Sequence, residues 1–271
     1  MTTASTSPSL LQNKHAVIFG ASGAIGQAVA KEFAAQGATV FLSGRRLAAV
    51  EQVAASIQQD GGIAYAAEVD ALDEQAVQTY LDSVAQQAGS IDILLNVTGP
   101  QPKDYGNGTS TLELPLEQYV LPLTTLVASQ FITARAAARH MVQQHSGAIL
   151  FITAPASREG QNVSAIGAAF GAMESLLRSL AADLGPAGVR VVGLRTGAMP
   201  ETRTIQQTLD NAVNTLGVPK EQIVSMLEQK TLLGRLSTVA DTARLAAFLA
   251  SDGAQTITGS IVNASSGMIT D

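Results

Sequence analysis

The segment at residues 15–37 constrains the fold of this chain more than any other part of its sequence. An apolar run over residues 15–19 has the length of a buried parallel strand, and it breaks at once into a turn rich in glycine. Apolar residues then recur at every fourth position, at Ile25, Val29 and Phe33. Gly37 stands where a helix of this kind is expected to end. The segment therefore predicts a strand, a glycine turn and a helix in direct succession.

A strand that leads through glycines into a helix is typical of dinucleotide-binding proteins. Glycine lets the main chain approach a pyrophosphate closely, and the free amides at the helix start hold the anion. The residues expected at this site are Gly20, Ser22, Gly23, Ala24, Ile25 and Gly26. Any single glycine can equally close a loop, so the prediction depends on the flanking strand and helix.

The residues after the second predicted strand, 38–42, bear on the choice of dinucleotide. A carboxylate at this place accepts a hydrogen bond from the ribose 2′-hydroxyl of NAD, whereas an arginine suits the 2′-phosphate of NADP. The chain has Ser43-Gly44-Arg45-Arg46 here and no acidic residue. We therefore expect NADP(H), bound through Arg45, and interpret Arg46 as a solvated cation at a helix start.

Strands and helices alternate along the rest of the chain. Further strands are predicted at residues 63–69, 91–96, 148–153, 189–194 and 260–263. This pattern predicts an α/β fold, a doubly wound parallel sheet (Rossmann fold) of about seven strands with helices on both faces. We expect residues 14–271 to form this single domain and residues 1–13 to be a flexible tail. The irregular stretch 196–236 is expected to shape the substrate pocket as a lid.

Composition argues against several kinds of partner and site. The net charge of −6 disfavours nucleic acid and anionic membrane surfaces, so the expected partner is a small-molecule substrate. The chain has no cysteine, and its three histidines lack the spacing of a metal site, so we expect no thiol chemistry and no metal. The N-terminus does not resemble a signal peptide, and we expect a cytoplasmic protein.

Asp70 follows the third predicted strand and has two interpretations. Ligands of open parallel sheets bind beyond the carboxyl ends of the strands, where a carboxylate can accept a hydrogen bond from the adenine amino group. The same residue can instead cap the helix that begins near Asp73. The residues alone favour neither interpretation.

Two loops at the carboxyl ends of predicted strands carry polar side chains toward the place where the cofactor is expected to bind. The loop after strand 91–96 is rich in proline and glycine and contains Lys103, Asp104 and Tyr105. The loop after strand 148–153 contains Ser157, Arg158 and Glu159. Tyr105 with Lys103 is a candidate acid and cation, although a solvated polar loop is the simpler interpretation of each residue taken singly.

From residue 14 to residue 267 the sequence resembles the short-chain dehydrogenase/reductase family. Its glycine turn is similar to the family's T-G-x-x-x-G-x-G at Gly20 and Gly26, and to the variant G-x-x-G-x-x-G at all three glycines of the turn. The resemblance implies a nicotinamide cofactor and an oxidoreductase that acts on a carbonyl, an alcohol or an activated alkene. It assigns further cofactor-binding residues, namely Asp70, Ala71, Asn96, Gly99, Gly197 and Thr202.

The resemblance fails where the family carries its catalytic side chains. Ala154 stands at the position of the family's serine, and Leu126 at that of its supporting asparagine. Gly167 and Gly171 stand at the positions of its tyrosine and lysine, which together protonate the alkoxide left by hydride transfer. No shift of the alignment restores the pair, because the chain's four tyrosines all precede residue 148. The catalytic residues are therefore unknown from the sequence.

Two functions fit such a sequence. The first is a reductase or dehydrogenase whose chemistry uses other residues, and we prefer it because atypical members of the family carry altered active sites. The second is a catalytically silent homologue that serves as a hetero-oligomer partner of an active relative or as an NADP(H) sensor. We also expect a homo-oligomer, dimer or tetramer, because the helix around Gly167 often lines a subunit interface in the family.

Overall fold

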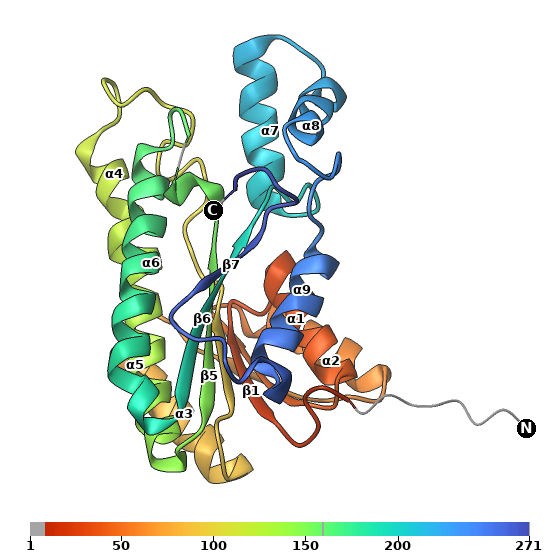
Figure 1. Cartoon of the computed structure of the whole chain (residues 1–271), viewed down its shortest axis with the longest axis vertical. Coiled ribbons are helices and arrows are strands. Elements are labelled where there is room, and N and C mark those ends of the chain that lie inside the picture. The colour runs from red at the N-terminus through yellow and green to blue at the C-terminus, as the bar shows by residue number, and fades with distance from the viewer. Residues whose placement is uncertain (1–8, 159, 271) are drawn as a thin grey trace, which may run out of the picture.

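A parallel sheet of seven strands, in the order β3-β2-β1-β4-β5-β6-β7, forms the centre of the chain (Figure 1). The computed structural model describes residues 9–158 and 160–270. The strands are β1 (His15–Phe19), β2 (Thr39–Gly44), β3 (Ile63–Glu68), β4 (Ile93–Asn96), β5 (Gly147–Thr153), β6 (Val189–Thr196) and β7 (Ile261–Ala264). The predicted α/β fold with a doubly wound parallel sheet is thus confirmed.

Helices cover both faces of this sheet. One face packs against α1 (Ala24–Ala35), α2 (Leu47–Gln59) and α9 (Val239–Ala250). The other packs against α3 (Glu74–Ala88), α5 (Ala128–Gln144) and α6 (Ser164–Leu184). Beyond the carboxyl ends of the strands stand α4 (Leu116–Pro122), α7 (Arg203–Leu216) and α8 (Lys220–Gln229) (Figure 1).

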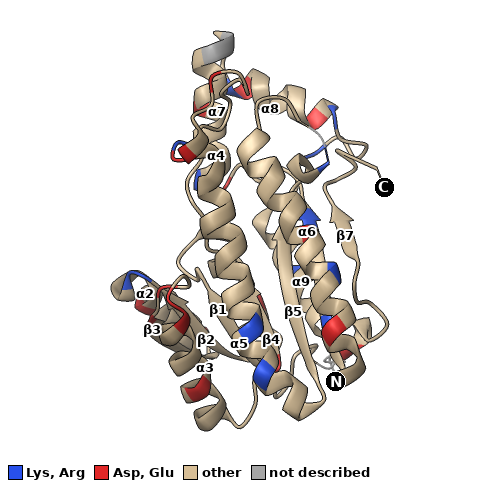
Figure 2. Cartoon of the chain, turned by 90° about the vertical axis from the view of Figure 1, so that its left-hand side faces the viewer, with Lys and Arg blue, Asp and Glu red and all other residues tan. Residues whose placement is uncertain are grey.

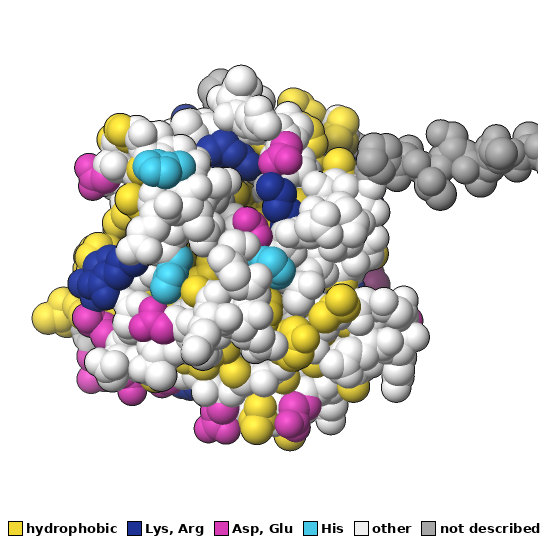
Figure 3. All heavy atoms as spheres, turned by 90° about the horizontal axis from the view of Figure 1, so that it is seen from below, with side chains coloured by type: hydrophobic (Ala, Val, Ile, Leu, Met, Phe, Trp, Pro, Cys, Tyr) yellow, Lys and Arg dark blue, Asp and Glu magenta, His cyan; other side chains and the backbone are white. Residues whose placement is uncertain are grey.

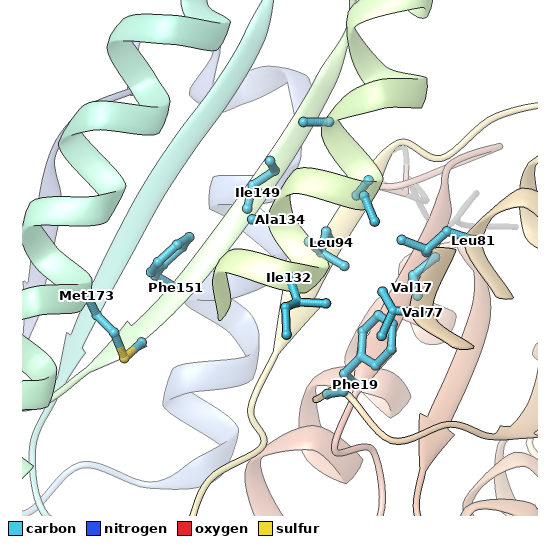
Figure 4. Packing of buried hydrophobic residues seen from close by; sticks show 14 of the residues in the cluster. Val17, Phe19, Val77, Leu81, Leu94, Ile132, Ala134, Ile149, Phe151 and Met173 are labelled. Atoms are coloured by element: carbon cyan, nitrogen blue, oxygen red, sulfur yellow. The ribbon is translucent and has the colours of Figure 1, made fainter. Parts of the chain in front are cut away.

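Two apolar cores fill the spaces between the sheet and its helix layers. Val17 and Phe19 of β1 lie beside Leu81 of α3, and all three side chains are fully buried (Figure 4). Successive side chains of a strand point to opposite faces, so Ile18 enters the other core with Phe33 of α1. The apolar run that predicted a buried strand is therefore buried on both sides.

The ends of some elements differ from the predicted ones. β2 continues to Gly44 and β6 to Thr196, because these residues still pair with β3 and β7. The predicted N-terminal tail is too long, since Leu11 is fully buried and its amide donates to the carbonyl of Gln36. Residues 9–13 therefore belong to the domain, and residues 1–8 of the predicted tail lie outside the described residues.

The long helical region over residues 116–144 is interrupted after its proline. Pro122 has no amide hydrogen to donate, and Leu123–Val127 form a π-helical turn between α4 and α5. By length and composition this is the one helical stretch in the described ranges that is able to cross a membrane, but half of its apolar window is buried inside the fold. We therefore attribute its apolar character to its place in the helix layer.

The start of α9, which packs against α1, carries a capping box. Thr238 Oγ1 accepts a hydrogen bond from the Asp241 amide at 3.0 Å, and Asp241 Oδ2 accepts one from the Thr238 amide at 3.2 Å. Hydrogen bonds from Arg235 and Thr238 lower the pKa of the Asp241 carboxyl from 3.8 to about 2. The ionised carboxylate is thus preferred in the folded state.

Replacing Asp241 by Asn is expected to lower the free energy of unfolding at neutral pH by about 1 kcal/mol, because the neutral amide loses the charge-assisted hydrogen bonds from Arg235 and Thr238. Because the folded-state pKa lies below the unfolded-state pKa, this contribution is complete above about pH 4 and is lost as the pH falls toward about 2. Denaturant titrations of D241N and the wild type should therefore converge over that range. The exposed Asp183→Asn serves as control, and a difference that persists to the lowest pH would contradict the assignment.

Candidate active site

The turn after β1 has a main-chain geometry that requires glycine. Gly20 has a φ of +77°, and a Cβ atom built on it would lie 3.0 Å from the amide nitrogen of Thr98. The amides of Gly20 and Ala21 donate to the carbonyl of Ser43, at 2.9 and 3.1 Å. The turn is therefore fixed against the carboxyl ends of β2 and β4. The edge of the sheet that the carboxyl ends of its strands form is called here the carboxyl edge.

Helix α1 begins directly beyond this turn. A Cβ atom on Gly26 would lie 2.4 Å from the carbonyl oxygen of Gly20, so the helix approaches the turn more closely than any side chain allows. Gly23 is the N-cap and offers no side chain to the first amides of the helix, those of Ala24 and Ile25. Such amides, at the positive end of the helix dipole, bind anions, and a pyrophosphate fits this cradle.

Arg45 and Arg46 follow β2 at the same edge. Both side chains are exposed, and neither forms an ion pair within residues 9–158 and 160–270. A Cβ atom on Gly44 would lie 3.9 Å from the hydroxyl oxygen of Ser22, which brings the glycine turn next to the residue that precedes Arg45. Arg46 is the N-cap of α2. Ser22 and Arg45 thus border one region beside the anion cradle.

Asp70 closes a turn after β3. Its Oδ1 atom accepts a hydrogen bond from the Leu72 amide at 3.0 Å. Helix α3 is capped instead by Asp73, whose Oδ1 accepts from the Ala76 amide at 3.0 Å. The capping interpretation of Asp70 is therefore wrong. Contact of Asp70 and the buried Ala71 with adenine stays a prediction.

Asn96, the last residue of β4, supports the loop that follows it. Its Oδ1 accepts from the amide and the hydroxyl of Thr98, at 2.9 and 2.7 Å, and its Nδ2 donates to Thr133 Oγ1 at 3.2 Å. Because Asn96 is 1% exposed, it can affect a bound ligand only through the loop after β4, which it holds in place. A Cβ atom on Gly99 would lie 3.4 Å from Leu126 of the π-helical turn. The predicted Gly99 and Leu126 are thus neighbours.

Gly197 and Thr202 follow β6, the strand that ends beside β5. A Cβ atom on the buried Gly197 would lie 3.1 Å from Ser237 Oγ. Thr202 is the N-cap of α7: its hydroxyl donates to the Met199 carbonyl at 2.8 Å and accepts from the Ile205 amide at 3.3 Å. The Thr202 side chain therefore orients the start of α7, and its contact with a cofactor stays a prediction.

The positions that resemble the family's catalytic set lie close together without reactive side chains. Ala154 directly follows β5, and a Cβ atom on Gly167 of α6 would lie 2.6 Å from the carbonyl oxygen of Ala156. One helical turn further, a Cβ atom on Gly171 would meet no atom within 4 Å. Helix α6 contains neither tyrosine nor lysine, so no register of this helix supplies the pair.

Tyr105, the candidate acid, points into the core. It is 4% exposed and belongs to the apolar cluster that contains Phe19 and Leu126. Burial, followed by the charge of Asp104, raises the pKa of the Tyr105 hydroxyl to about 12. Lys103 is exposed to solvent. Because one side chain is buried in the core and the other is solvated, they do not form the predicted pair of acid and cation.

A buried ion pair that is absent from the predicted set lies next to Ala154. Glu174 of α6 and Arg195 of β6 are 6% and 3% exposed, and Arg195 Nη2 donates to both carboxylate oxygens at 3.0 Å. Glu174 Oε1 also accepts from Thr153 Oγ1 at 3.2 Å and from Ser157 Oγ at 2.6 Å. The signal in the sequence was an arginine, Arg195, near the end of the mostly apolar strand β6, which also contains Arg190. Glu159, predicted beside Ser157, lies outside the described residues.

The loop after β4 contacts both α7 and the segment before α6. Asn107 Nδ2 donates to Thr208 Oγ1 of α7 at 3.2 Å, and the Gly108 amide donates to the carbonyl of Asn162 at 2.9 Å. These contacts join three segments that are distant in sequence at the carboxyl edge (Figure 1). That residues 196–236 shape a substrate pocket stays a prediction.

A cavity of about 350 Å³ lies at the opposite edge of the sheet, lined by residues at the amino ends of β5 and β6. Figure 3 shows acidic, basic and histidine side chains mixed on this face. Lys14 pairs with Asp252 at 3.1 Å, and Arg190 Nη1 donates to the Leu249 carbonyl at 2.8 Å. In the described part of the chain, no three acidic or histidine side chains are grouped to hold a metal ion.

The two glycines of the cradle give a matched pair of variants. Gly26→Ala places a methyl group against the Gly20 carbonyl and is expected to lower the melting temperature and to abolish dinucleotide binding. In Gly23→Ala the same methyl group would lie 3.4 Å from that oxygen with φ −78°, so folding should be retained. Calorimetry and NADPH fluorescence titration check both variants. A G26A protein that binds as tightly as the wild type would contradict the assigned cradle.

Known proteins match this chain over nearly its whole length. A family model described as "Enoyl-(Acyl carrier protein) reductase" matches residues 20–269. The 7alpha-hydroxysteroid dehydrogenase of Escherichia coli (strain K12) is 31% identical over 258 residues, which are 95% of this chain and 94% of that protein.

Solved structures agree with these matches. The crystal structure of NAD+-bound xylitol dehydrogenase has a TM-score of 0.88 at 25% identity and covers 95% of this chain and 99% of its own. That of 7 alpha-hydroxysteroid dehydrogenase with NADH and 7-oxo glycochenodeoxycholic acid has a TM-score of 0.84 at 30% identity and covers 97% of both chains. With the sheet order and the glycine cradle, these matches show that the chain belongs to the short-chain dehydrogenase/reductase family.

Proposed function

We propose that this chain is an NADP(H)-dependent oxidoreductase that acts on a carbonyl or alcohol, or on an activated alkene, through a non-standard active site. The observation that carries the proposal is the cradle at the start of α1. The close contact between Gly26 and the Gly20 carbonyl brings the start of α1 against the turn, where its first main-chain amides are available to an anion. The dehydrogenases that the chain resembles act on alcohols or carbonyls, as their names state.

The residues of the carboxyl edge suit a nicotinamide dinucleotide. The cradle from Gly20 to Gly26 would hold the pyrophosphate, Asp70 and Ala71 the adenine, and Asn96, Gly99, Gly197 and Thr202 the loops around the nicotinamide. The nicotinamide, when bound, exchanges a hydride with a carbon atom of the substrate. The protein must then exchange a proton with the substrate oxygen or with the adjacent carbon.

The choice of NADP(H) is based on Arg45. The two related structures named above contain NAD+ and NADH, so the proposal of NADP(H) is based on this chain's own residues. No carboxylate stands between Ser43 and Arg46, whereas the Arg45 guanidinium is exposed and Ser22 lies nearby. A guanidinium binds a phosphate through two charge-assisted hydrogen bonds, and a serine hydroxyl can add a third.

The composition of α6 favours a second candidate function. A helix without tyrosine or lysine, preceded by Ala154, is what a silent homologue would retain, with NADP(H) acting as a structural or regulatory ligand. Such a protein would serve an active relative in a hetero-oligomer or sense the nucleotide.

We also propose an oligomer, dimer or tetramer, through the helix layer that contains α5 and α6. Figure 2 shows long stretches of these helices without charged side chains. Phe131 of α5 is 41% exposed on this layer. Apolar side chains left on a surface of this kind favour burial against another subunit.

A turnover screen separates the two functions. The pure protein should oxidise NADPH in the presence of ketones or enones, or reduce NADP+ in the presence of secondary alcohols. NADPH binding without turnover of any compound would support the silent homologue, and co-purification with an intact relative would identify its partner.

Variants of the two arginines test the choice of cofactor. Arg45→Ala is expected to raise the Kd of NADPH at least tenfold, equivalent to about 1.4 kcal/mol, because the 2′-phosphate loses its cation. The Kd of NADH should change less than about twofold, since NADH has no such phosphate. Arg46→Ala, one residue further on the same surface, is the control and should leave both values unchanged. Equal effects of R45A on both nucleotides would contradict the NADP(H) assignment.

A further inference from the structure

Ser157 carries the one side-chain hydroxyl in the segment Ala154 to Arg158, which follows β5 at the carboxyl edge. The position that resembles the family's substrate-binding serine is occupied by Ala154, three residues earlier. Ser157 is half-buried and ends a 3₁₀ turn that packs against α6. A hydroxyl is therefore present beside the vacated position, although not on the expected residue.

The Ser157 hydroxyl donates its hydrogen to the Glu174 carboxylate. Ser157 Oγ lies 2.6 Å from Glu174 Oε1, and the Glu174 carboxylate is ion-paired with Arg195. An ionised carboxylate only accepts hydrogen bonds, so Ser157 must be the donor. A serine hydroxyl has a single hydrogen and two lone pairs. Toward any other group, Ser157 therefore offers only acceptor capacity.

This orientation is held from several sides. Glu174 Oε1 also accepts from Arg195 Nε at 3.2 Å and from Thr153 Oγ1 at 3.2 Å, and Thr153 and Arg195 are paired across β5 and β6. Both charges are almost completely buried, where an unpaired charge is very unfavourable. Rotation of the Glu174 carboxylate would break these contacts, so the direction of the Ser157 hydroxyl is fixed.

The neighbouring face of α6 leaves room next to this group. Gly167, Gly171 and Glu174 are spaced by four and three residues and lie on one face of the helix. A Cβ atom on Gly171 would meet nothing within 4 Å, so a helical turn beside Glu174 is uncovered. In the family this stretch carries the lysine, whose absence leaves space for a ligand group.

We propose that Ser157 is a specificity-determining acceptor for a substrate hydroxyl, so that the site binds an alcohol more tightly than the matching ketone. This inference rests on the proposed oxidoreductase function and names its preferred substrate class. An alcohol O–H can donate to the free lone pair of Ser157 Oγ. A carbonyl oxygen has no hydrogen to donate, so Ser157 gives a ketone no hydrogen bond. Glu174 and Arg195 are positioning residues, because they hold the Ser157 hydroxyl so that it can only accept a hydrogen bond from the substrate.

Binding of matched pairs in non-reactive complexes tests this inference without turnover. The alcohol is titrated into protein saturated with NADPH and the ketone into protein saturated with NADP+, since neither combination can exchange a hydride. The pairs are isopropanol with acetone, cyclohexanol with cyclohexanone, and 1-phenylethanol with acetophenone. Ligand-observed NMR gives the Kd of each.

Ser157→Ala is expected to weaken alcohol binding about tenfold and to change ketone binding less than about twofold. Ser157→Thr keeps the hydroxyl and should restore most of the alcohol affinity. The exposed Ser175→Ala, next to Glu174 on α6, is the control.

The outcomes separate the two proposals. If S157A weakens an alcohol and its ketone equally, or neither of them, the assignment of Ser157 is wrong and the oxidoreductase function is unaffected. If the wild type binds NADPH but no member of any pair, the role of Ser157 as an acceptor for a substrate alcohol is contradicted, while the turnover screen decides the oxidoreductase function separately. Retention of the melting temperature in S157A and S157T shows that the comparison is made between folded proteins.

Discussion

The approach of one stretch of main chain to another, at the turn between β1 and α1, is the constraint on which the rest of the carboxyl edge depends. The carbonyl oxygen of Gly20 occupies the space that a side chain at Gly26 would need. The same turn is tied to β2 through Ser43 and lies against the backbone at Thr98 after β4. Three strand ends are thus fixed by contacts that involve almost no side-chain atoms. This explains how the cradle can persist while side chains elsewhere change.

The second contact that organises this edge is the buried ion pair of Glu174 and Arg195, whose formation has a large desolvation cost. Transfer of a charge from water into a protein interior costs several kcal/mol per ion, of the order of what the pairing returns. The Glu174–Arg195 pair is therefore weak evidence for added stability. Its geometrical effect is clearer, because the pair joins α6, the end of β6 and the turn at Ser157 through hydrogen bonds of 2.6 to 3.2 Å. The pair fixes the direction of the Ser157 hydroxyl, and apolar residues in place of Glu174 and Arg195 would not do so.

Periodicity and glycine placement predicted most of the fold, because they are local properties. The buried runs specified the strands, and the strand predicted over residues 15–19 has the observed bounds of β1, His15–Phe19. The strand ends were less accurate, since pairing with neighbours extends β2 to Gly44 in a way that the local sequence does not show.

The candidate site was harder to predict, because it depends on contacts between distant residues. Glu174 and Arg195 are 21 residues apart and meet only after α6 packs on the sheet. Tyr105 stands in a polar, proline-rich loop, yet the loop folds back and buries it in the apolar cluster that contains Phe19. Asp70 and Asp73 both suit a helix cap by composition, and main-chain geometry selects Asp73. The conformation of each of these side chains is decided by tertiary packing.

The 3₁₀ turn at Pro155–Ser157 has an evolutionary consequence. It sets the Ala156 carbonyl where the first side-chain atom of any residue at position 167 would be. A single codon change that restored a tyrosine there would meet backbone, which cannot rotate aside as a side chain can. A tyrosine at position 167 would fit only if the turn and the helix shifted together, so the replacement of Gly167 alone is not enough to place the family's tyrosine in this backbone.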